Sequence, residues 1–211
     1  LVVQPGVEFG PMTVYHLPLD RSFDLRSVMM RWPNLALEAH STDYQKPAAY
    51  PRLAELGFAY QKVGPALTFA WRQAIYALDQ MLSFLQGSAP IVIPTMERIM
   101  LENAGAWQSH YQGEPNAKFA QRHLALADRI RYYWPHPDAQ AAVSALMTAM
   151  ESQTLNRSVS ELFFPNSTLE RAELCGGLNA ETLITSSVEQ SLEPYFFHSG
   201  SFAAPARERS A

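Results

Sequence analysis

The chain has 211 residues, enough to bury one sizeable core, and its formal net charge is −4. No basic block is present, so we expect no nucleic-acid partner. No apolar stretch is long enough to span a membrane, so we expect no membrane association. Cys175 is the single cysteine, which excludes an internal disulfide and is typical of a reducing, cytoplasmic location. The chain begins with Leu1 inside a strand-like run, so we expect it to belong to a longer protein.

Strand and helix patterns alternate through the first 86 residues. Strands are predicted at Val2–Phe9, Leu35–Thr42 and Phe58–Val63. Helices are predicted at Asp20–Arg31 and Ala48–Leu56, followed by a long helix that Pro65 begins; Gly57 suits the left-handed position after the second. Crossovers this short predict parallel strands in an α/β sheet.

From Gly87 onward the sequence is helical in character. Helices are predicted at Thr95–Tyr111, Phe119–Trp134, Asp138–Gln153 with Asp138 as N-cap, Ser158–Phe164 and Asn179–Leu192. The last residues, 199–211, are small and polar and are predicted to be disordered. The predicted organisation is therefore βα units over 1–86, a helical region over 87–198 and a tail over 199–211.

The run from Leu35 to Gln45 is the strongest candidate for a site. In a strand Glu38, His40 and Thr42 share one face, and Leu37, Ala39 and Ser41 share the other. A single histidine is more often a hydrogen-bonded core residue, but three polar groups on one face of an apolar strand favour a functional surface. An imidazole and a carboxylate at a strand's carboxyl end can act as metal ligands or as acid and base, and the segment leaves both roles open.

Two further segments carry candidate groups. Lys62 and Gly64 lie between a strand and a helix N-terminus, which suits a bound phosphate and suits a tight turn equally well. Gln4 and Glu8 repeat the alternating pattern in the first strand, although Pro5 and Gly6 can shift the face.

The segment 128–136, Asp-Arg-Ile-Arg-Tyr-Tyr-Trp-Pro-His, is rich in aromatic and cationic groups. It is either a binding edge or, as we favour, a docked helix end whose arginines, Arg129 and Arg131, pair with carboxylates. The histidines other than His40 have no metal-ligand spacing, so we interpret them as structural or solvated.

Four of these segments together resemble one family. They are Val2–Phe9, Glu38–Gln45, Lys62–Ala70 and Asp128–His136, and the resemblance extends over about residues 1 to 198. The family is that of the non-catalytic, Z-type accessory subunits of D-tagatose-1,6-bisphosphate aldolase, also labelled tagatose-6-phosphate kinases. The resemblance implies a TIM (β/α)8 barrel about twice this long, of which the chain carries the last three βα units and the C-terminal helical region.

The same resemblance implies a site at the mouth of the barrel. It makes Asp43 and Glu8 catalytic, His40 a metal ligand, and Lys62, Gly64, Ser41 and Gln45 the groups that bind a phosphorylated ketose. It implies a divalent metal, zinc or similar, in the full-length protein.

The implied function is that of an accessory subunit for a separate catalytic class II aldolase subunit in tagatose 6-phosphate, galactitol and N-acetylgalactosamine catabolism. The alternative is a metal-dependent ketose or ketose-phosphate 4-epimerase. A kinase is disfavoured because no glycine-rich nucleotide-binding loop is present. We expect the 211 residues alone to be inactive, with open strand edges that promote aggregation.

Overall fold

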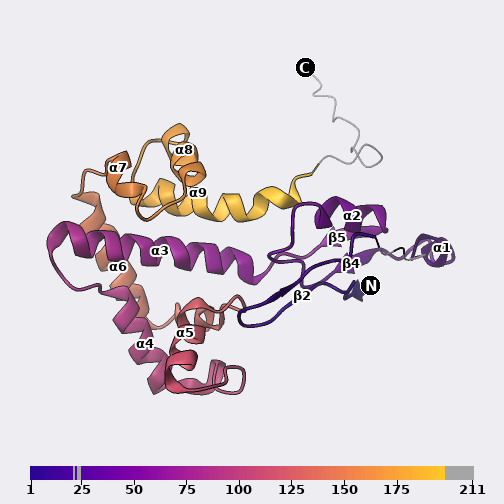
Figure 1. The fold of residues 1–211 in the computed structure, drawn as a ribbon, viewed down its shortest axis with the longest axis horizontal. Coiled ribbons are helices and arrows are strands. Elements are labelled where there is room, and N and C mark those ends of the chain that lie inside the picture. Colours follow the sequence, from indigo (N-terminus) through magenta and orange to yellow (C-terminus); the bar gives the residue numbers. More distant parts are fainter. Residues whose placement is uncertain (21, 23–24, 198–211) are drawn as a thin grey trace. The chain divides into compact units, whose positions relative to one another are not determined.

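A computed structural model describes residues 1–20, 22 and 25–197, so the tail predicted at 199–211 lies outside the described residues. The architecture is mixed α/β, mostly helical with a small parallel sheet (Figure 1). The strands are β1 (Val2–Val3), β2 (Glu8–Phe9), β3 (Val14–Tyr15), β4 (Leu37–Ala39) and β5 (Phe58–Gln61). The α-helices are α1 (Leu25–Met30), α2 (Ala49–Glu55), α3 (Pro65–Gln86), α4 (Val92–Glu102), α5 (Pro115–Leu124), α6 (Pro137–Glu151), α7 (Arg157–Ser160), α8 (Asn166–Leu174) and α9 (Ala180–Leu192). The 3₁₀ turns are η1 (Ala104–Ala106), η2 (Arg129–Tyr133) and η3 (Glu193–Tyr195).

The parallel sheet has the strand order β1-β4-β5, which confirms the predicted parallel pairing. Glu38 of β4 stands opposite Val2 of β1 and Tyr60 of β5. Because all three strands run the same way, their carboxyl ends meet at one edge of the sheet. That edge collects the polar groups that follow each strand.

The prediction of one strand over Val2–Phe9 is wrong. Val2–Val3 pairs in the parallel sheet, whereas Glu8–Phe9 pairs with β3, a strand that the sequence did not predict. Pro5 has no N–H to donate, and Gly6 adopts a positive φ of 92°, so the chain turns between the two short strands.

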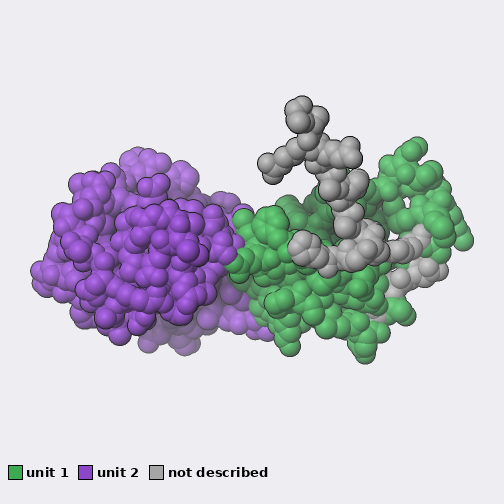
Figure 2. All heavy atoms as spheres, turned by 90° about the horizontal axis from the view of Figure 1, so that it is seen from above, with its two compact units in different colours: residues 1–8, 14–63, 192–211 green, residues 9–13, 64–191 purple. Residues whose placement is uncertain are grey.

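The chain divides into two compact units (Figure 2). Unit 1 comprises Leu1–Glu8, Val14–Val63 and the described residues from Leu192 onward. Its core is built from Leu37 and Ala39 of β4, Phe58 of β5 and Leu53 of α2, all buried. Gly57, just past α2, has φ 105°, as predicted.

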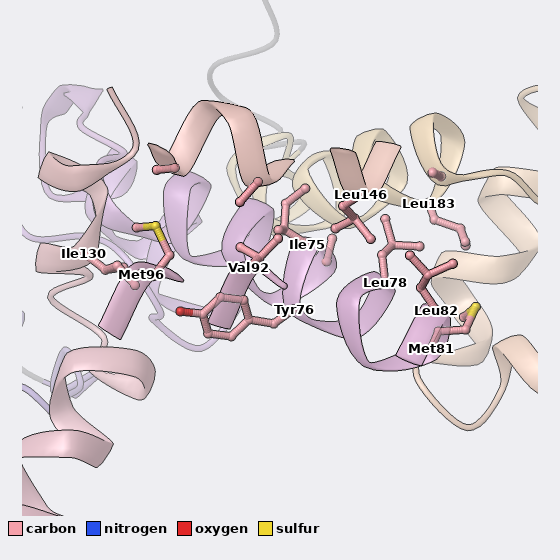
Figure 3. Close-up of a cluster of buried hydrophobic side chains, with 14 of the residues drawn as sticks. Ile75, Tyr76, Leu78, Met81, Leu82, Val92, Met96, Ile130, Leu146 and Leu183 are labelled. Atoms are coloured by element: carbon pink, nitrogen blue, oxygen red, sulfur yellow. The ribbon is translucent and has the colours of Figure 1, made fainter. Parts of the chain in front are cut away.

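Unit 2 comprises Phe9–Thr13 and Gly64–Ser191 and is organised around α3. Pro65 stands in the first turn of this helix, and Gly87 ends it in the left-handed conformation. Figure 3 shows side chains of the unit 2 core packed together, and those that it labels belong to α3, α4, η2, α6 and α9. Its labelled members include Ile75, Leu78, Met96, Ile130, Leu146 and Leu183. Among the described residues, no helix combines the length and the apolar character needed to cross a membrane.

The predicted helix Phe119–Trp134 is wrong in one respect: it is two pieces. Helix α5 ends at Leu124, Ala125 is extended, and η2 follows Asp128, which has a positive φ of 46°. The break places the Asp128 carboxylate against the buried Arg72 guanidinium, with an Nε–Oδ1 distance of 2.6 Å. This long-range ion pair overrides the local helical pattern.

Other helix predictions also differ from the structure: the predicted helix Thr95–Tyr111 ends at Glu102, and the one predicted at Ser158–Phe164 is α7, which ends at Ser160. Helix α4 begins at Val92 rather than Thr95, because Asp79 of α3 accepts hydrogen bonds from the backbone N–H groups of residues 91–93. The N-cap of α6 is His136, whose Nδ1 accepts from the Asp138 N–H, rather than Asp138 itself. The sequence did not predict α8.

Candidate functional site at the carboxyl ends of the parallel strands

The candidate site is centred on the loop from His40 to Gln45, which joins β4 to α2. Two of its residues, Ser41 and Tyr44, adopt left-handed conformations with φ of 57° and 62°. Such conformations disfavour non-glycine residues and persist where surrounding contacts over-determine the backbone. The loop is therefore strained, and its neighbours hold it in place.

Glu38 and His40 face the same way, as predicted for a strand. Glu38 Oε1 lies 2.7 Å from His40 Nε2, and both side chains are about one-third exposed. An imidazole beside a carboxylate can take up and return a proton at a solvent-accessible position.

Thr42 does not share that face, because the left-handed Ser41 redirects the chain. The Thr42 hydroxyl is fully buried and donates to the Lys62 carbonyl oxygen over 2.8 Å. It also lies 3.0 Å from the hydroxyl of Tyr195 in η3, while the Tyr50 hydroxyl donates to the Thr42 carbonyl oxygen over 3.2 Å. Thr42 thus ties the end of β4 to the end of β5 and to the C-terminal turn.

Tyr50 and Tyr195 form an aromatic layer beside this hydrogen-bonded centre, with ring centroids 4.5 Å apart. Burial raises the pKa of both phenols, and the negative charge of Asp43 raises both further. Both tyrosines therefore remain neutral hydrogen-bonding groups near neutral pH. Sequence reasoning missed them, and for Tyr195 no local signal exists, since it lies 153 positions from Thr42.

Asp43 and Gln45 are both buried. The Gln45 side-chain oxygen accepts from the Leu17 N–H over 3.0 Å, and its nitrogen donates to the Tyr15 carbonyl over 3.1 Å. The Gln45 amide thus fixes the segment after β3 to the loop.

Gln4 brings two predicted site residues together. Its amide nitrogen donates to the Glu8 carboxylate and lies 3.4 Å from the Ser41 hydroxyl oxygen. Lys62 is exposed, and its backbone N–H donates to the Ala39 carbonyl. Gly64 is the N-cap residue of α3.

The described part of the chain contains no group of three or more His, Cys, Asp or Glu side chains that could hold a metal ion. The Glu38–His40 pair supplies two donors of suitable chemistry, which is short of a complete ligand set.

Comparisons with known proteins agree on one family. The family model described as "D-tagatose-1,6-bisphosphate aldolase subunit GatZ/KbaZ-like" matches residues 1–199. The chain belongs to the GatZ/KbaZ-like family. It is 40% identical over 202 residues to a D-tagatose 6-phosphate 4-epimerase of Agrobacterium fabrum, covering 94% of this chain and 47% of that protein. It is 38% identical to the D-tagatose-1,6-bisphosphate aldolase subunit GatZ of Klebsiella pneumoniae, covering 92% and 46%.

A solved structure extends the likeness to three dimensions. The crystal structure of a probable tagatose 6-phosphate kinase from Sinorhizobium meliloti matches with a TM-score of 0.85 at 38% identity, covering 92% of this chain and 51% of that one. The chain thus spans about half the length of the GatZ/KbaZ-like relatives that it matches.

In this family member the aromatic and cationic segment 128–136 is a structural feature of unit 2. The expectation that Arg129 and Arg131 pair with carboxylates is wrong: the Arg129 guanidinium donates to the Ala106 carbonyl, and that of Arg131 donates to the Ala127 carbonyl. His123 is buried between the Tyr76 hydroxyl and the Glu97 carboxylate, which confirms its predicted structural role.

Proposed function

We propose that this chain is part of an accessory subunit of D-tagatose-1,6-bisphosphate aldolase. In this proposal residues 1–86 supply the last three βα units of a TIM-type barrel, and residues 87–198 form the C-terminal helical region. The three adjacent parallel strands and the family membership support it. The partner is a separate catalytic class II aldolase subunit, and the ligand is a phosphorylated ketose.

The observation that carries the proposal is the strained loop after β4. A subunit that served only as a scaffold would have no need to hold Ser41 and Tyr44 in left-handed conformations beside a partly exposed imidazole–carboxylate pair. Strain of this kind, at the carboxyl ends of parallel strands, is typical of a binding site.

We assign binding roles to four of the predicted site residues. The exposed Lys62 ammonium can meet a phosphate, and the N-cap residue Gly64 begins a helix whose free N–H groups favour an anion. Ser41 offers a half-buried hydroxyl to the sugar. Gln45 fixes the backbone that presents these groups.

Two carboxylates complete the proposed acid–base chemistry. Asp43 lies buried beside the tyrosine layer, and Glu8 is exposed and hydrogen-bonded by Gln4. Together with the Glu38–His40 pair they provide groups that can exchange protons with a carbonyl substrate.

For the divalent metal we propose a single ligand. His40, beside Glu38, is the one metal ligand that we carry forward. Because the described residues hold no group of three or more such side chains, a complete ligand set would need residues from outside them. We therefore assign the divalent ion to the full-length protein.

The second candidate is a ketose-phosphate 4-epimerase. The similarity to the Agrobacterium fabrum epimerase favours it, at 40% identity over 202 residues. An acid–base pair at the strand ends serves either reaction, so the geometry alone does not separate the two.

An assay of the full-length protein separates them. Tagatose 6-phosphate, fructose 6-phosphate and tagatose 1,6-bisphosphate are each offered with and without the catalytic aldolase subunit, and with and without a divalent metal. Interconversion of the two monophosphates without the partner identifies an epimerase. Stimulated cleavage of the bisphosphate only with the partner identifies an accessory subunit.

A pair of variants tests the site itself. His40→Ala should weaken ketose-phosphate binding, measured by calorimetry, or reduce turnover at least tenfold without lowering the melting temperature. His110→Ala, at an exposed histidine of unit 2, is the matched control and should change neither quantity. Unchanged binding and turnover in His40→Ala would remove His40 from the site.

A further inference from the structure

Unit 2 contains a cavity of about 320 Å³ that the proposed function does not use. It is lined by α3, by the turn before α8, and by α8 and α9, which Figure 1 marks. Small side chains make the space: Ala70, Ala74 and Ala77 follow helical spacing along one face of α3. Its volume is at the lower end of the range for small-molecule sites.

None of the residues that line this cavity is charged. A phosphate or carboxylate buried there would lack a cation to pair with, and an ammonium group would lack an anion. The cavity therefore disfavours the phosphorylated ketose of the proposed function and favours a neutral ligand.

The polar lining is organised by hydrogen bonds. The Thr168 hydroxyl, whose residue is 1% exposed, donates to the Gln190 side-chain oxygen over 2.7 Å. This bond directs the Gln190 amide so that its NH₂ group is left to donate to a ligand. The Ser187 hydroxyl donates to the Leu183 carbonyl over 2.7 Å, which leaves its oxygen able to accept. Gln73, exposed on α3, adds a second amide at the rim.

The lining thus combines donors and acceptors with apolar surface. Phe163, Phe164 and Pro165 supply flat or rigid apolar faces beside the amides and hydroxyls. A ligand that fits must offer groups that both donate and accept, together with C–H surface, and must carry no charge. Hydroxyl groups on a short carbon chain or ring have these properties.

We propose that this cavity binds a small neutral polyhydroxylated molecule, such as an unphosphorylated sugar or alditol. The site lies wholly in unit 2 and shares no residue with the strand-end cluster. It does not depend on the proposed aldolase or epimerase function.

The test follows the side-chain amide signals of Gln73 and Gln190 by ¹⁵N NMR during titration with D-fructose and with sorbitol. We expect saturable shifts with a dissociation constant of about 1 mM, the value that the usual affinity per ligand atom gives for a twelve-atom molecule. Fructose 6-phosphate and inorganic phosphate should leave both amide signals unchanged, whatever they do at the strand ends. That readout keeps this site distinct from the first.

Three variants decide the assignment. Gln190→Leu should weaken binding of the neutral ligands at least tenfold, judged from the Gln73 amide signal. Gln73→Leu, at an exposed position, should weaken it about threefold, judged from the Gln190 amide signal. Gln80→Leu, at an exposed glutamine of α3 outside the cavity, is the matched control and should bind as the wild type does. Absence of saturable shifts, equal shifts with the phosphorylated sugar, or equal weakening by Gln80→Leu would overturn the proposal.

Discussion

Thr42→Val tests whether the buried hydroxyl at the end of β4 holds the candidate site together. Valine has nearly the shape of threonine, so the substitution removes the hydroxyl and leaves the packing volume unchanged. Two interactions disappear: the 2.8 Å hydrogen bond to the Lys62 carbonyl and the 3.0 Å contact with the Tyr195 hydroxyl. The Lys62 carbonyl then loses its donor, and because Thr42 is fully buried, we expect no water to replace the missing hydroxyl.

The expected cost follows from these two bonds. Each buried hydrogen bond contributes about 1 kcal/mol net, and more where a partner is left unsatisfied, so Thr42→Val should lower the free energy of unfolding by about 2 kcal/mol. For a protein of this size the melting temperature should fall by about 4–8 °C. Thermal melts followed by near-ultraviolet circular dichroism include this region, because the tilted rings of Tyr50 and Tyr195 lie in contact next to it.

Two comparisons isolate the hydroxyl. Thr42→Ser keeps it and deletes one buried methyl group, which should cost about 1 kcal/mol and less than Thr42→Val. Tyr195→Phe should cost about 1 kcal/mol in the wild type and clearly less in the Thr42→Val background, since the two substitutions remove the same contact. A Thr42→Val protein that melts with the wild type, or above Thr42→Ser, would refute the reasoning.

Three further predictions concern unit 2. Asp128→Asn should lower the free energy of unfolding by about 3–5 kcal/mol, measured by urea denaturation, because it leaves the Arg72 charge buried without its partner. The double variant Arg72→Met with Asp128→Leu should be more stable than Asp128→Asn alone, and the opposite order would contradict this account. Asp79→Ala should lower the free energy of unfolding by about 2–4 kcal/mol in the same assay, because three backbone N–H groups at the start of α4 lose their acceptor. A loss below about 1 kcal/mol would show that water replaces the carboxylate. Burial lowers the pKa of His123 below its ordinary value of 6.5 despite the Glu97 carboxylate. The stabilisation that this residue contributes is therefore complete above pH 6.5 and is lost as the pH falls through the lowered pKa. The fall in melting temperature between pH 7.5 and pH 5 should be smaller in His123→Gln, and an equal fall would assign the pH dependence to other groups.

Much of the fold could be predicted from local patterns. The apolar strand cores around Leu37 and Phe58, the long helix from Pro65 and the left-handed Gly57 each follow from periodicity or from the conformational limits of one residue type. The Glu38–His40 pair also follows from the two-residue period of a strand.

The features that the sequence did not predict depend on residues far apart in the chain. The predicted helix breaks after Leu124, ahead of the Asp128–Arg72 ion pair, and helix α4 begins where Asp79 accepts from the backbone N–H groups of residues 91–93. Neither event leaves a local signal, because the energy of a buried carboxylate depends on the partner that the fold brings to it.

The same division runs through the candidate site. The sequence alone determined which segment carries the titratable groups, since alternation on a strand places Glu38 and His40 on one face. Only the tertiary structure decided how that segment is held. Thr42 does not lie on the predicted face, because the left-handed Ser41 turns the backbone. The Thr42 hydroxyl lies against the hydroxyl of Tyr195, a residue 153 positions away that reaches the strand ends only in the folded chain. A side chain's face follows from local backbone geometry, whereas its hydrogen-bond partner follows from packing, which local sequence does not encode.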